Sequence, residues 1–400
     1  MIRTVSRKAF MLALLASAAV WTALACAGLF GQRQLFCFEG RELLYDFWMP
    51  RDCLRHGYVR DDGIEKSGWI SPGDLRAGKV ETGDWQEGLT FRTGWVDRVY
   101  PAFALMPLKA FPDTWTGAWC WTAAAGAVFL LSLVVLAGGR LWPVLFCCSM
   151  PFLFNFERGN PVWLSAAFCG IFLAWWDDPR LGRRLAAAAC LAAATDMKVA
   201  PVLLGALYVP GIVRARGAVR SLAMPLFAAA CAAVLFVVPW LFVPDGLAGV
   251  PEFLSNAGHH GKAFLRTADF GLVQLWRTVR LACGETVRDP WTGMEAVARL
   301  SQAAGLLAVA LGAWRRQLMP LVGGFLLAAG NMYYYGALYL LPVFVLTAGE
   351  RMAPLEALLW FAVVCPLQVV LLGHSGNAVL CNLATMALTA KALVCYNTQR

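Results

Sequence analysis

Asp46 is the residue of this 400-residue chain that is best placed to do chemistry. It lies in Leu43-Leu44-Tyr45-Asp46-Phe47-Trp48, a short distance after the first long apolar run, 9–31. A carboxylate at this point could remove a proton from an attacking hydroxyl group. The rings of Tyr45 and Trp48 could stack on a sugar or shield the acid. The alternative is an ordinary solvated acid.

The sequence Glu157-Arg158-Gly159-Asn160 separates two apolar runs with almost no turn around it. Arg158 could bind a phosphate or a carboxylate, because its guanidinium donates two parallel hydrogen bonds. Asn160 is placed to cap the following helix, with Pro161 at the first helical position. The structural alternative is a salt-bridged turn. Glu157 and Asn160 are candidate substrate-binding residues, because an anionic lipid headgroup would lie at this height.

Asp196-Met197-Lys198 is likewise a short polar sequence between two apolar segments. Lys198 would therefore lie at or below the membrane interface. Its ammonium could hold a phosphate as a point charge, and the alternative is a local ion pair with Asp196.

A second polar segment carries His259-His260 together with Lys262 and Arg266. Neighbouring side chains diverge in a regular element, so two adjacent histidines are poor ligands for a single metal. Phosphate contact or general acid catalysis by His259 or His260 is the functional hypothesis, and a solvated loop is the alternative. No Cys-x-x-Cys occurs, and no metal site is expected.

The composition predicts the class of protein that holds these residues. Hydrophobic residues make up 59% of the chain and charged residues 15%, with a mean hydropathy of +0.59. A soluble domain carries about 25% charged residues, so a polytopic membrane protein is expected. The net charge of +9 comes from basic residues in short connections, which the positive-inside rule explains without a nucleic-acid partner.

Apolar runs between charges, glycines and prolines predict an all-α polytopic bundle of about twelve transmembrane helices in a single domain, 1–400. The expected spans are 9–31 (uncleaved), 114–137, 141–155, 160–176, 182–195, 198–213, 221–243, 296–313, 318–334, 336–349, 354–372 and 376–394. Arginines and lysines recur in alternate connections, which predicts that both termini are cytoplasmic. The short spans 182–195 and 198–213 are expected to be buried among neighbours.

Two long polar segments, 32–113 and 244–295, fall on the extracytoplasmic side of this topology. The first is expected to form a mixed-charge cap with an elaboration at 58–94. The stretch 100–112 contains three prolines and fits an interfacial or re-entrant helix better than a span. Cys37 and Cys53 share this loop and could form a disulfide in an oxidising periplasm. All the candidate residues fall on this side, which favours an outward-facing site.

These residues resemble the GT-C superfamily of polyprenyl-phosphate-dependent glycosyltransferases, and most of all its GT87 group of mannosyltransferase-like proteins. The resemblance covers roughly the first half of the chain. It runs through Tyr45-Asp46-Phe47, Leu54-Arg55-His56-Gly57, Tyr100-Pro101 with Pro107, Phe156-Glu157-Arg158-Gly159-Asn160 and Lys198-Val199-Ala200-Pro201. The usual Tyr-Pro-Pro of the group reads Tyr100-Pro101-Ala102 here, and the common Gly-Gln-x-Asn reads Glu157-Arg158-Gly159-Asn160. These departures bear on the substrate more than on the reaction type.

The resemblance implies a multi-pass GT-C-like enzyme of the bacterial inner membrane, with Asp46 as an outward-facing catalytic base. It implies transfer of a mannose-like hexose, with inversion, from a polyprenyl-phosphate sugar to a lipid-linked or glycan acceptor, without a metal or other cofactor. The donor phosphate would be bound by Arg158, Lys198, His259 and His260. The substrate-binding residues would be Tyr45, Trp48, Tyr100, Glu157 and Asn160.

Two other functions are compatible with about twelve spans and charges at membrane depth. A transporter or lipid flippase would show related halves with broken helices at matching positions. Here only one half carries an elaborated outer loop after its first helix, which favours an enzyme. The enzymatic alternatives are an envelope polysaccharide polymerase and a membrane acyltransferase.

Overall fold

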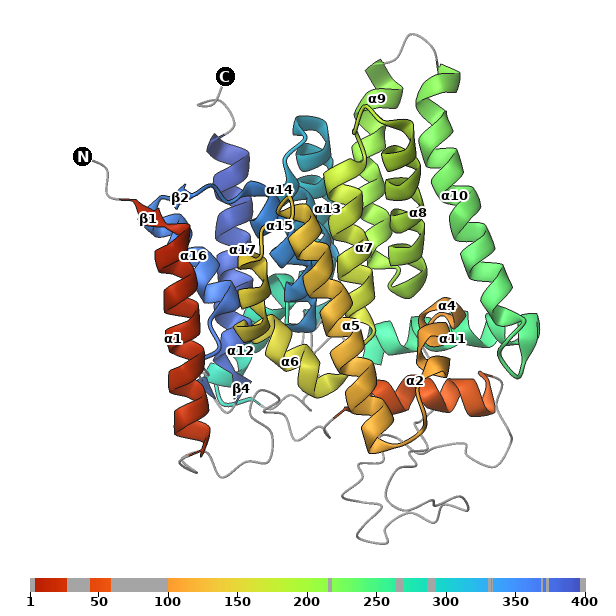
Figure 1. The fold of residues 1–400 in the computed structure, drawn as a ribbon, viewed down its shortest axis with the longest axis horizontal. Coiled ribbons are helices and arrows are strands. Elements are labelled where there is room, and N and C mark those ends of the chain that lie inside the picture. The colour runs from red at the N-terminus through yellow and green to blue at the C-terminus, as the bar shows by residue number, and fades with distance from the viewer. Residues whose placement is uncertain are drawn as a thin grey trace, which may run out of the picture.

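The computed structural model describes residues 4–26, 44–58, 100–214, 218–263, 269–285, 293–329, 332, 334–367, 370–371 and 374–395. Figure 1 shows these residues as a bundle of helices, with four strands of two residues each. The elaboration at 58–94, apart from Tyr58, and Cys37, the proposed disulfide partner of Cys53, lie outside the described residues.

The first half of the chain runs from the N-terminus to the end of α9. Its elements are β1 (Val5–Ser6), α1 (Arg7–Cys26), α2 (Tyr45–His56), α4 (Ala102–Leu105), η2 (Met106–Ala110), α5 (Trp115–Leu136), η3 (Trp142–Cys148), α6 (Met150–Arg158), α7 (Val162–Trp175), α8 (Leu181–Met197), η4 (Ala200–Tyr208) and α9 (Val209–Arg214).

The second half continues the bundle. Its elements are α10 (Ala218–Trp240), η5 (Gly246–Gly249), α11 (Val250–Ala263), α12 (Gly271–Ala282), α13 (Met294–Arg315), α14 (Leu318–Ala328), η7 (Tyr334–Tyr339), α15 (Leu340–Thr347), β2 (Arg351–Met352), α16 (Pro354–Val364), β3 (Val370–Leu371), β4 (His374–Ser375) and α17 (Gly376–Val394).

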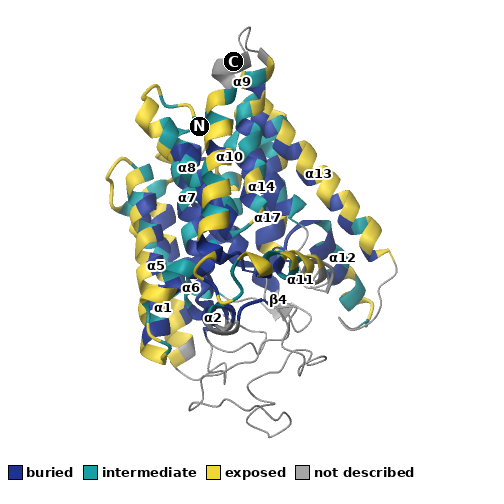
Figure 2. Ribbon diagram, turned by 90° about the vertical axis from the view of Figure 1, so that its right-hand side faces the viewer, coloured by how far each residue is buried: buried dark blue, intermediate teal, exposed yellow. Residues whose placement is uncertain are grey.

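Within the described part of the chain, five helices are long and apolar enough to cross a membrane, namely α1, α5, α10, α13 and α17. Their outward faces expose large aliphatic side chains such as Leu131, Leu226 and Leu307, and Figure 2 shows exposed stripes along α5 and α13. A soluble protein would rarely leave so much apolar surface in water. The fold is that of an all-helical membrane protein. The number of twelve spans and the sidedness remain predictions.

Several expected spans consist of two short helices instead of one long helix. The expected span 141–155 is η3 followed by α6, and each of these helices has a proline at its start, Pro143 and Pro151. The expected span 198–213 is η4 followed by α9, and Pro201 stands at the start of η4. Proline fits the first turn of a helix but interrupts a longer one, because it has no N–H to donate.

Glycines allow a close contact between the helices α13 and α14. A Cβ atom added at Gly305 would lie 2.5 Å from the amide nitrogen of Ala328, and one added at Gly324 would lie 2.7 Å from the carbonyl oxygen of Gly305. Small residues let two backbones approach in this way, and the close approach adds van der Waals contacts between the helices. Such contacts matter in a membrane, because the hydrophobic effect does not drive helices together in apolar lipid.

Several of the basic connections between helices lie together at one end of the bundle. The amide of Arg7 donates to the carbonyl of Glu350 at 2.8 Å, and β1 pairs antiparallel with β2. Arg316 forms an ion pair with Asp177 at 2.6 Å. The described elements nearest the two termini, β1 and the end of α17, lie at this end, and α2, α4 and α11 lie at the opposite end (Figure 1). This arrangement agrees with the alternation of basic connections along the sequence.

The stretch 100–112 forms α4 and η2 at the end opposite the basic connections. Ala102, Ala104, Leu105 and Leu108 are fully buried. Lys109 and Ala110, at the end of η2, are exposed, so the stretch has one buried and one uncovered face, and the choice between an interfacial and a re-entrant helix remains a prediction.

Candidate functional site

Asp46 lies on a short helix, α2, inside the first long polar segment, 32–113. It is the second residue of α2. The helix is held by Arg51, whose guanidinium donates to the carbonyl oxygens of Leu108 at 2.8 Å and of Phe111, and forms an ion pair with Asp113. These contacts fix α2 against η2, and so they fix the position of the Asp46 carboxylate.

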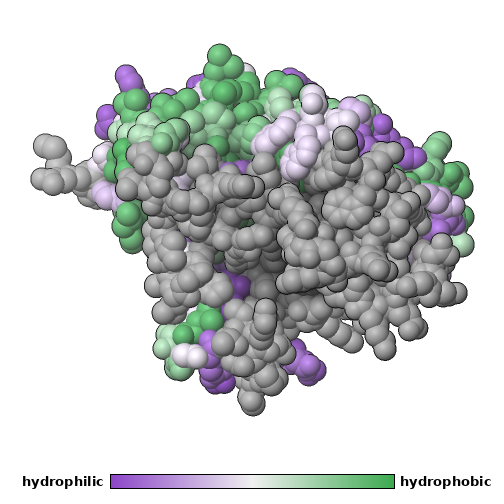
Figure 3. All heavy atoms as spheres, turned by 90° about the horizontal axis from the view of Figure 1, so that it is seen from below, coloured by the Kyte–Doolittle hydropathy of each residue, from purple (hydrophilic) through white to green (hydrophobic). Residues whose placement is uncertain are grey.

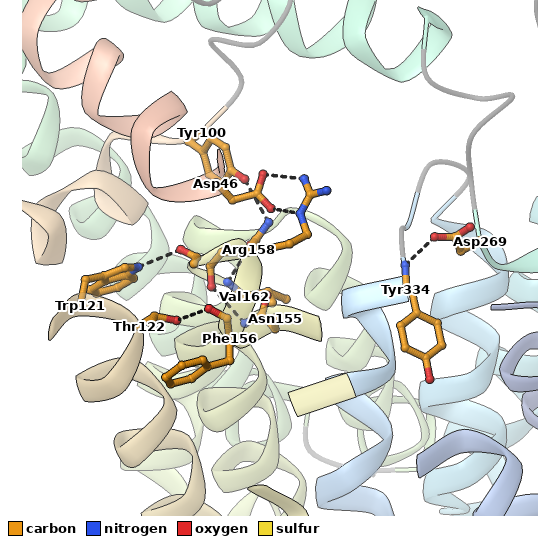
Figure 4. A network of polar contacts seen from close by, with 12 residues as sticks. Asp46, Tyr100, Trp121, Thr122, Asn155, Phe156, Arg158, Val162, Asp269 and Tyr334 are labelled. Carbon is orange, nitrogen blue, oxygen red and sulfur yellow. Dashed lines mark hydrogen bonds and ion pairs between the residues drawn. The ribbon is translucent and has the colours of Figure 1, made fainter. Parts of the chain in front are cut away.

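The turn 155–160 places Arg158 opposite α2. Three backbone carbonyl oxygens of this turn accept hydrogen bonds from side chains. Trp121 Nε1 donates to the carbonyl of Gly159 at 2.8 Å, Thr122 Oγ1 to that of Phe156 at 3.2 Å, and the Asn155 side-chain amide to that of Asn160 at 3.3 Å. These bonds satisfy backbone groups that the end of α6 would otherwise leave unpaired. The turn is therefore rigid, and Figure 4 shows it below the Asp46 carboxylate.

Asn160 accepts a hydrogen bond from the amide of Val162 at 2.9 Å, as the expected cap of the following helix requires. Its amide group also donates to the Tyr100 hydroxyl at 3.1 Å. Asn160 and Tyr100 are both buried. Asn160 thus joins the start of α7 to Tyr100, two residues before α4 begins.

Replacing Gly159 with alanine is expected to destabilise the protein. Gly159 has φ +70°, and an added Cβ would lie 3.3 Å from the Cβ of Phe47 and 3.4 Å from Leu44 Cδ2. The backbone strain alone costs about 1–2 kcal/mol. Gly138→Ala is the matched control, because Gly138 has φ +68° and open space around it. In thermal unfolding in detergent, Gly159→Ala should lose more stability than Gly138→Ala, and equal losses would contradict the packing argument.

Asp46 and Arg158 form a two-pronged ion pair between residues 112 positions apart in the chain. Arg158 Nε lies 2.5 Å from Asp46 Oδ2 and Arg158 Nη2 lies 2.9 Å from Asp46 Oδ1. The two residues are only 2% and 5% exposed. Arg158 was expected to meet a phosphate or to close a local salt bridge, and in this structure its guanidinium is bound to the candidate base.

Lys198 lies beside this pair with its ammonium over two tyrosine rings. Its Nζ is 4.4 Å from the ring centroid of Tyr100 and 5.3 Å from that of Tyr335. The face of a tyrosine ring attracts a cation electrostatically. This contact is not a hydrogen bond, so the N–H groups of the Lys198 ammonium can still donate to a ligand. Among the described residues, Lys198 has no carboxylate partner, and Asp196 Oδ2 is buried without a donor. The local Asp196–Lys198 ion pair is therefore not formed.

The charges of the cluster control the protonation of Asp46 and Lys198. Burial would raise the pKa of Asp46, but the charge and hydrogen bonds of Arg158, helped by Asn160 and Lys198, outweigh burial and lower it. Burial is also the main cause that lowers the pKa of Lys198 to about 8, against the opposing pull of Asp46. Asp46 is thus an anion at neutral pH, and Lys198 titrates close to neutrality.

The structure brings together five of the ten residues that the sequence predicts for the site, namely Asp46, Tyr100, Arg158, Asn160 and Lys198. Glu157 lies next to Arg158, is buried, and accepts a backbone hydrogen bond from Leu44 at 2.6 Å. The remaining four have side chains outside the described residues. The backbones of Tyr45 and Trp48 belong to α2, and those of His259 and His260 belong to α11.

Two features near the site were not predicted from the sequence. The first is Tyr335, whose ring lies beside Lys198; the run Tyr333-Tyr334-Tyr335 at the end of the expected span 318–334 could have suggested it. The second is the buried ion pair of Asp269 and Arg277, with Oδ1 and Nη2 2.9 Å apart. The other Asp269 oxygen accepts from the amide of Tyr334 at 2.8 Å.

Figure 4 shows Asp269 and Tyr334 to one side of the Asp46–Arg158 pair. The turn at Tyr334 and Tyr335 joins the two clusters, because Tyr334 binds Asp269 and the Tyr335 ring meets Lys198. Viewed from this end of the bundle, hydrophilic atoms of described residues are visible near the middle of the face (Figure 3).

Metal ligands do not gather in the part of the chain that the structure describes, where no three His, Cys, Asp or Glu side chains lie together. The chemistry of the cluster itself is that of one carboxylate and two cations. A carboxylate can accept a proton, and an arginine fork with a lysine can bind a phosphate. No protein-family model, curated protein or solved structure matches this chain.

Proposed function

We propose that this protein is an inverting glycosyltransferase that moves a hexose from a polyprenyl-phosphate sugar to a hydroxyl of a lipid-linked or glycan acceptor. The observation that carries the proposal is the cluster of a buried, ionised carboxylate, Asp46, with two cations, the buried Arg158 and the half-buried Lys198. It lies at the end of a helical membrane bundle opposite the basic connections, where the positive-inside rule places the extracytoplasmic side.

The proposed reaction is a direct displacement at the anomeric carbon. The acceptor oxygen forms a bond to this carbon as the bond from the carbon to the phosphate oxygen breaks. The electron pair of the broken bond stays on the phosphate, and the acceptor proton passes to Asp46. Arg158 and Lys198 stabilise the charge that develops on the phosphate, and stabilisation of this kind contributes several kcal/mol in a site with little water.

Arg158 has two partners in this proposal, one after the other. In the free protein its guanidinium binds Asp46 through two hydrogen bonds. A phosphate entering beside Lys198 would compete for these donors. Asp46 would then lose the interaction that lowers its pKa and become a stronger base. Asp46 would thus become a strong base only after the donor has bound.

The KM for the donor is expected to rise with pH. The ammonium of Lys198 is largely charged below its pKa of about 8 and is lost above it, whereas the phosphodiester stays anionic throughout. For a single group, KM at pH 9 would be up to about tenfold higher than at pH 7. Initial rates with varied donor would measure this, with Lys198→Arg as the control, because a guanidinium stays charged. A wild-type KM that does not change from pH 7 to pH 9 would refute this role for Lys198.

The experiment that tests the proposed function uses purified wild-type protein in vesicles with radiolabelled polyprenyl-phosphate hexoses and candidate acceptor lipids. We expect label in a new glycosidic bond whose anomeric configuration is opposite to that of the donor. Movement of the lipid across the bilayer without a new bond would favour the flippase alternative. Transfer from a nucleotide sugar alone would exclude the lipid-phosphate donor.

A further inference from the structure

A cavity of about 560 Å³ opens at the basic end of the bundle, far from Asp46. Its polar lining includes Arg7, Lys8 and Arg351, and its apolar lining includes Met11, Trp142 and Leu145. None of these residues takes part in the proposed sugar transfer. We call this cavity the basic-end cavity.

The walls of the basic-end cavity are fixed by backbone and ring contacts. β1 pairs with β2 so that Ser6 lies opposite Arg351, and the amide of Arg7 bonds to Glu350. The guanidinium of Arg7 lies over the ring of Trp142, 4.5 Å from its centroid. The N-terminal segment, η3 and the connection before α16 are therefore held together around the cavity.

The basic-end cavity has an excess of positive charge. Its one acidic lining residue, Glu350, is 81% exposed and is shared by Arg7 at 3.9 Å and Arg140 at 4.0 Å. Lys8 and Arg351 are exposed, and neither has a carboxylate partner among the residues that the structure describes. An anion would therefore find at least two available cations here.

The position of the cavity relative to the membrane decides between kinds of anion. α1 is long and apolar enough to span, and the cavity lies at its first turn. Leu12, one turn further along α1, is 55% exposed on the outside of the bundle, and Met11 is buried in the wall. Basic residues thus lie at headgroup height, directly above apolar surface that continues toward the lipid chains.

We propose that the basic-end cavity binds one anionic phospholipid. Lys8 and Arg351 contact its phosphate, and its acyl chain leaves along Met11, Leu12 and Leu145. Basic pockets between transmembrane helices are suited to anionic headgroups, because each nearby Lys or Arg adds to the attraction. This inference is independent of the proposed sugar transfer and holds whether or not that proposal survives.

Native mass spectrometry of the delipidated full chain, titrated with phosphatidylglycerol or phosphatidylcholine, tests the proposal. We expect one phosphatidylglycerol to bind in preference to phosphatidylcholine, and affinity to fall about 10- to 30-fold in Lys8→Gln/Arg351→Gln. The control is Arg180→Gln/Arg183→Gln, which removes two charges from another basic connection and should bind as wild type does. Both pairs of side chains are at the protein surface, so thermal melting should show that all three proteins are folded.

Three results would overturn the proposal. The first is unchanged phosphatidylglycerol affinity in Lys8→Gln/Arg351→Gln. The second is equal binding of phosphatidylcholine, which would mean that no anion is recognised. The third is full competition by soluble glycerol phosphate at the same concentration, which would make this a site for a free phosphate and not for a lipid.

Discussion

Replacing Asp46 with asparagine is expected to lower kcat for sugar transfer by about 10²- to 10⁴-fold. The amide cannot accept the acceptor proton, whereas its oxygen can still receive a hydrogen bond from Arg158, so the site should keep its shape. The KM for the donor should change by no more than a few-fold, because Arg158 and Lys198 still face the phosphate. Initial rates with a radiolabelled donor measure both constants.

Two control variants separate chemistry from folding in this experiment. Asp269→Asn loses another buried carboxylate that is also paired with an arginine, so its melting temperature shows the structural cost of such a change. Glu356→Gln removes a partly exposed carboxylate paired with Lys391 and should transfer sugar as wild type does. A folded Asp46→Asn protein with wild-type kcat would refute the role of Asp46 as the base.

Replacing Arg158 with leucine is expected to destabilise the protein by about 3–5 kcal/mol and to abolish transfer. The substitution leaves the Asp46 carboxylate buried without its partner, and removing one member of a buried ion pair has a cost of this size. Arg158→Lys keeps the charge but loses the two-pronged geometry, so it should recover part of the stability and little of the activity. Unfolding in detergent and the transfer assay measure the two effects.

The double variant Asp46→Asn/Arg158→Leu tests this explanation. It removes both buried charges, so it should be more stable than Arg158→Leu alone. The control pair is Arg183 and Asp178, which are 3.0 Å apart with an arginine side chain that is 44% exposed. Breaking this surface pair should change stability by at most about 1 kcal/mol. A double variant no more stable than Arg158→Leu would mean that the stability loss comes from packing, not from an unpaired charge.

The general arrangement of the fold could be predicted from the sequence, because apolar runs and basic connections are local signals. The helices α5, α10, α13 and α17 lie close to the expected spans, and the basic connections meet at one end of the bundle. Local signals also placed Arg158 and Lys198 beside turns on the same side as Asp46. Their convergence at one end of the bundle follows from the alternation of spans.

The sequence could not predict which partners meet across the bundle. The Asp46–Arg158 pair joins residues 112 positions apart, and no periodic pattern records such a contact. The helix α2 was missed because it contains polar residues and Pro50, and its stability comes from the long-range bonds of Arg51. Asp269 and Arg277 were missed because their burial depends on the packing of α12 against other helices.

The most direct test of the central claim is a single-turnover transfer experiment on donor-loaded protein. Wild-type protein and Asp46→Asn are each loaded with radiolabelled polyprenyl-phosphate hexose and then mixed with an excess of acceptor. We expect both proteins to retain the donor equally before mixing, and only wild type to move the label to the acceptor within one turnover. Rapid transfer of the bound label by Asp46→Asn would contradict it.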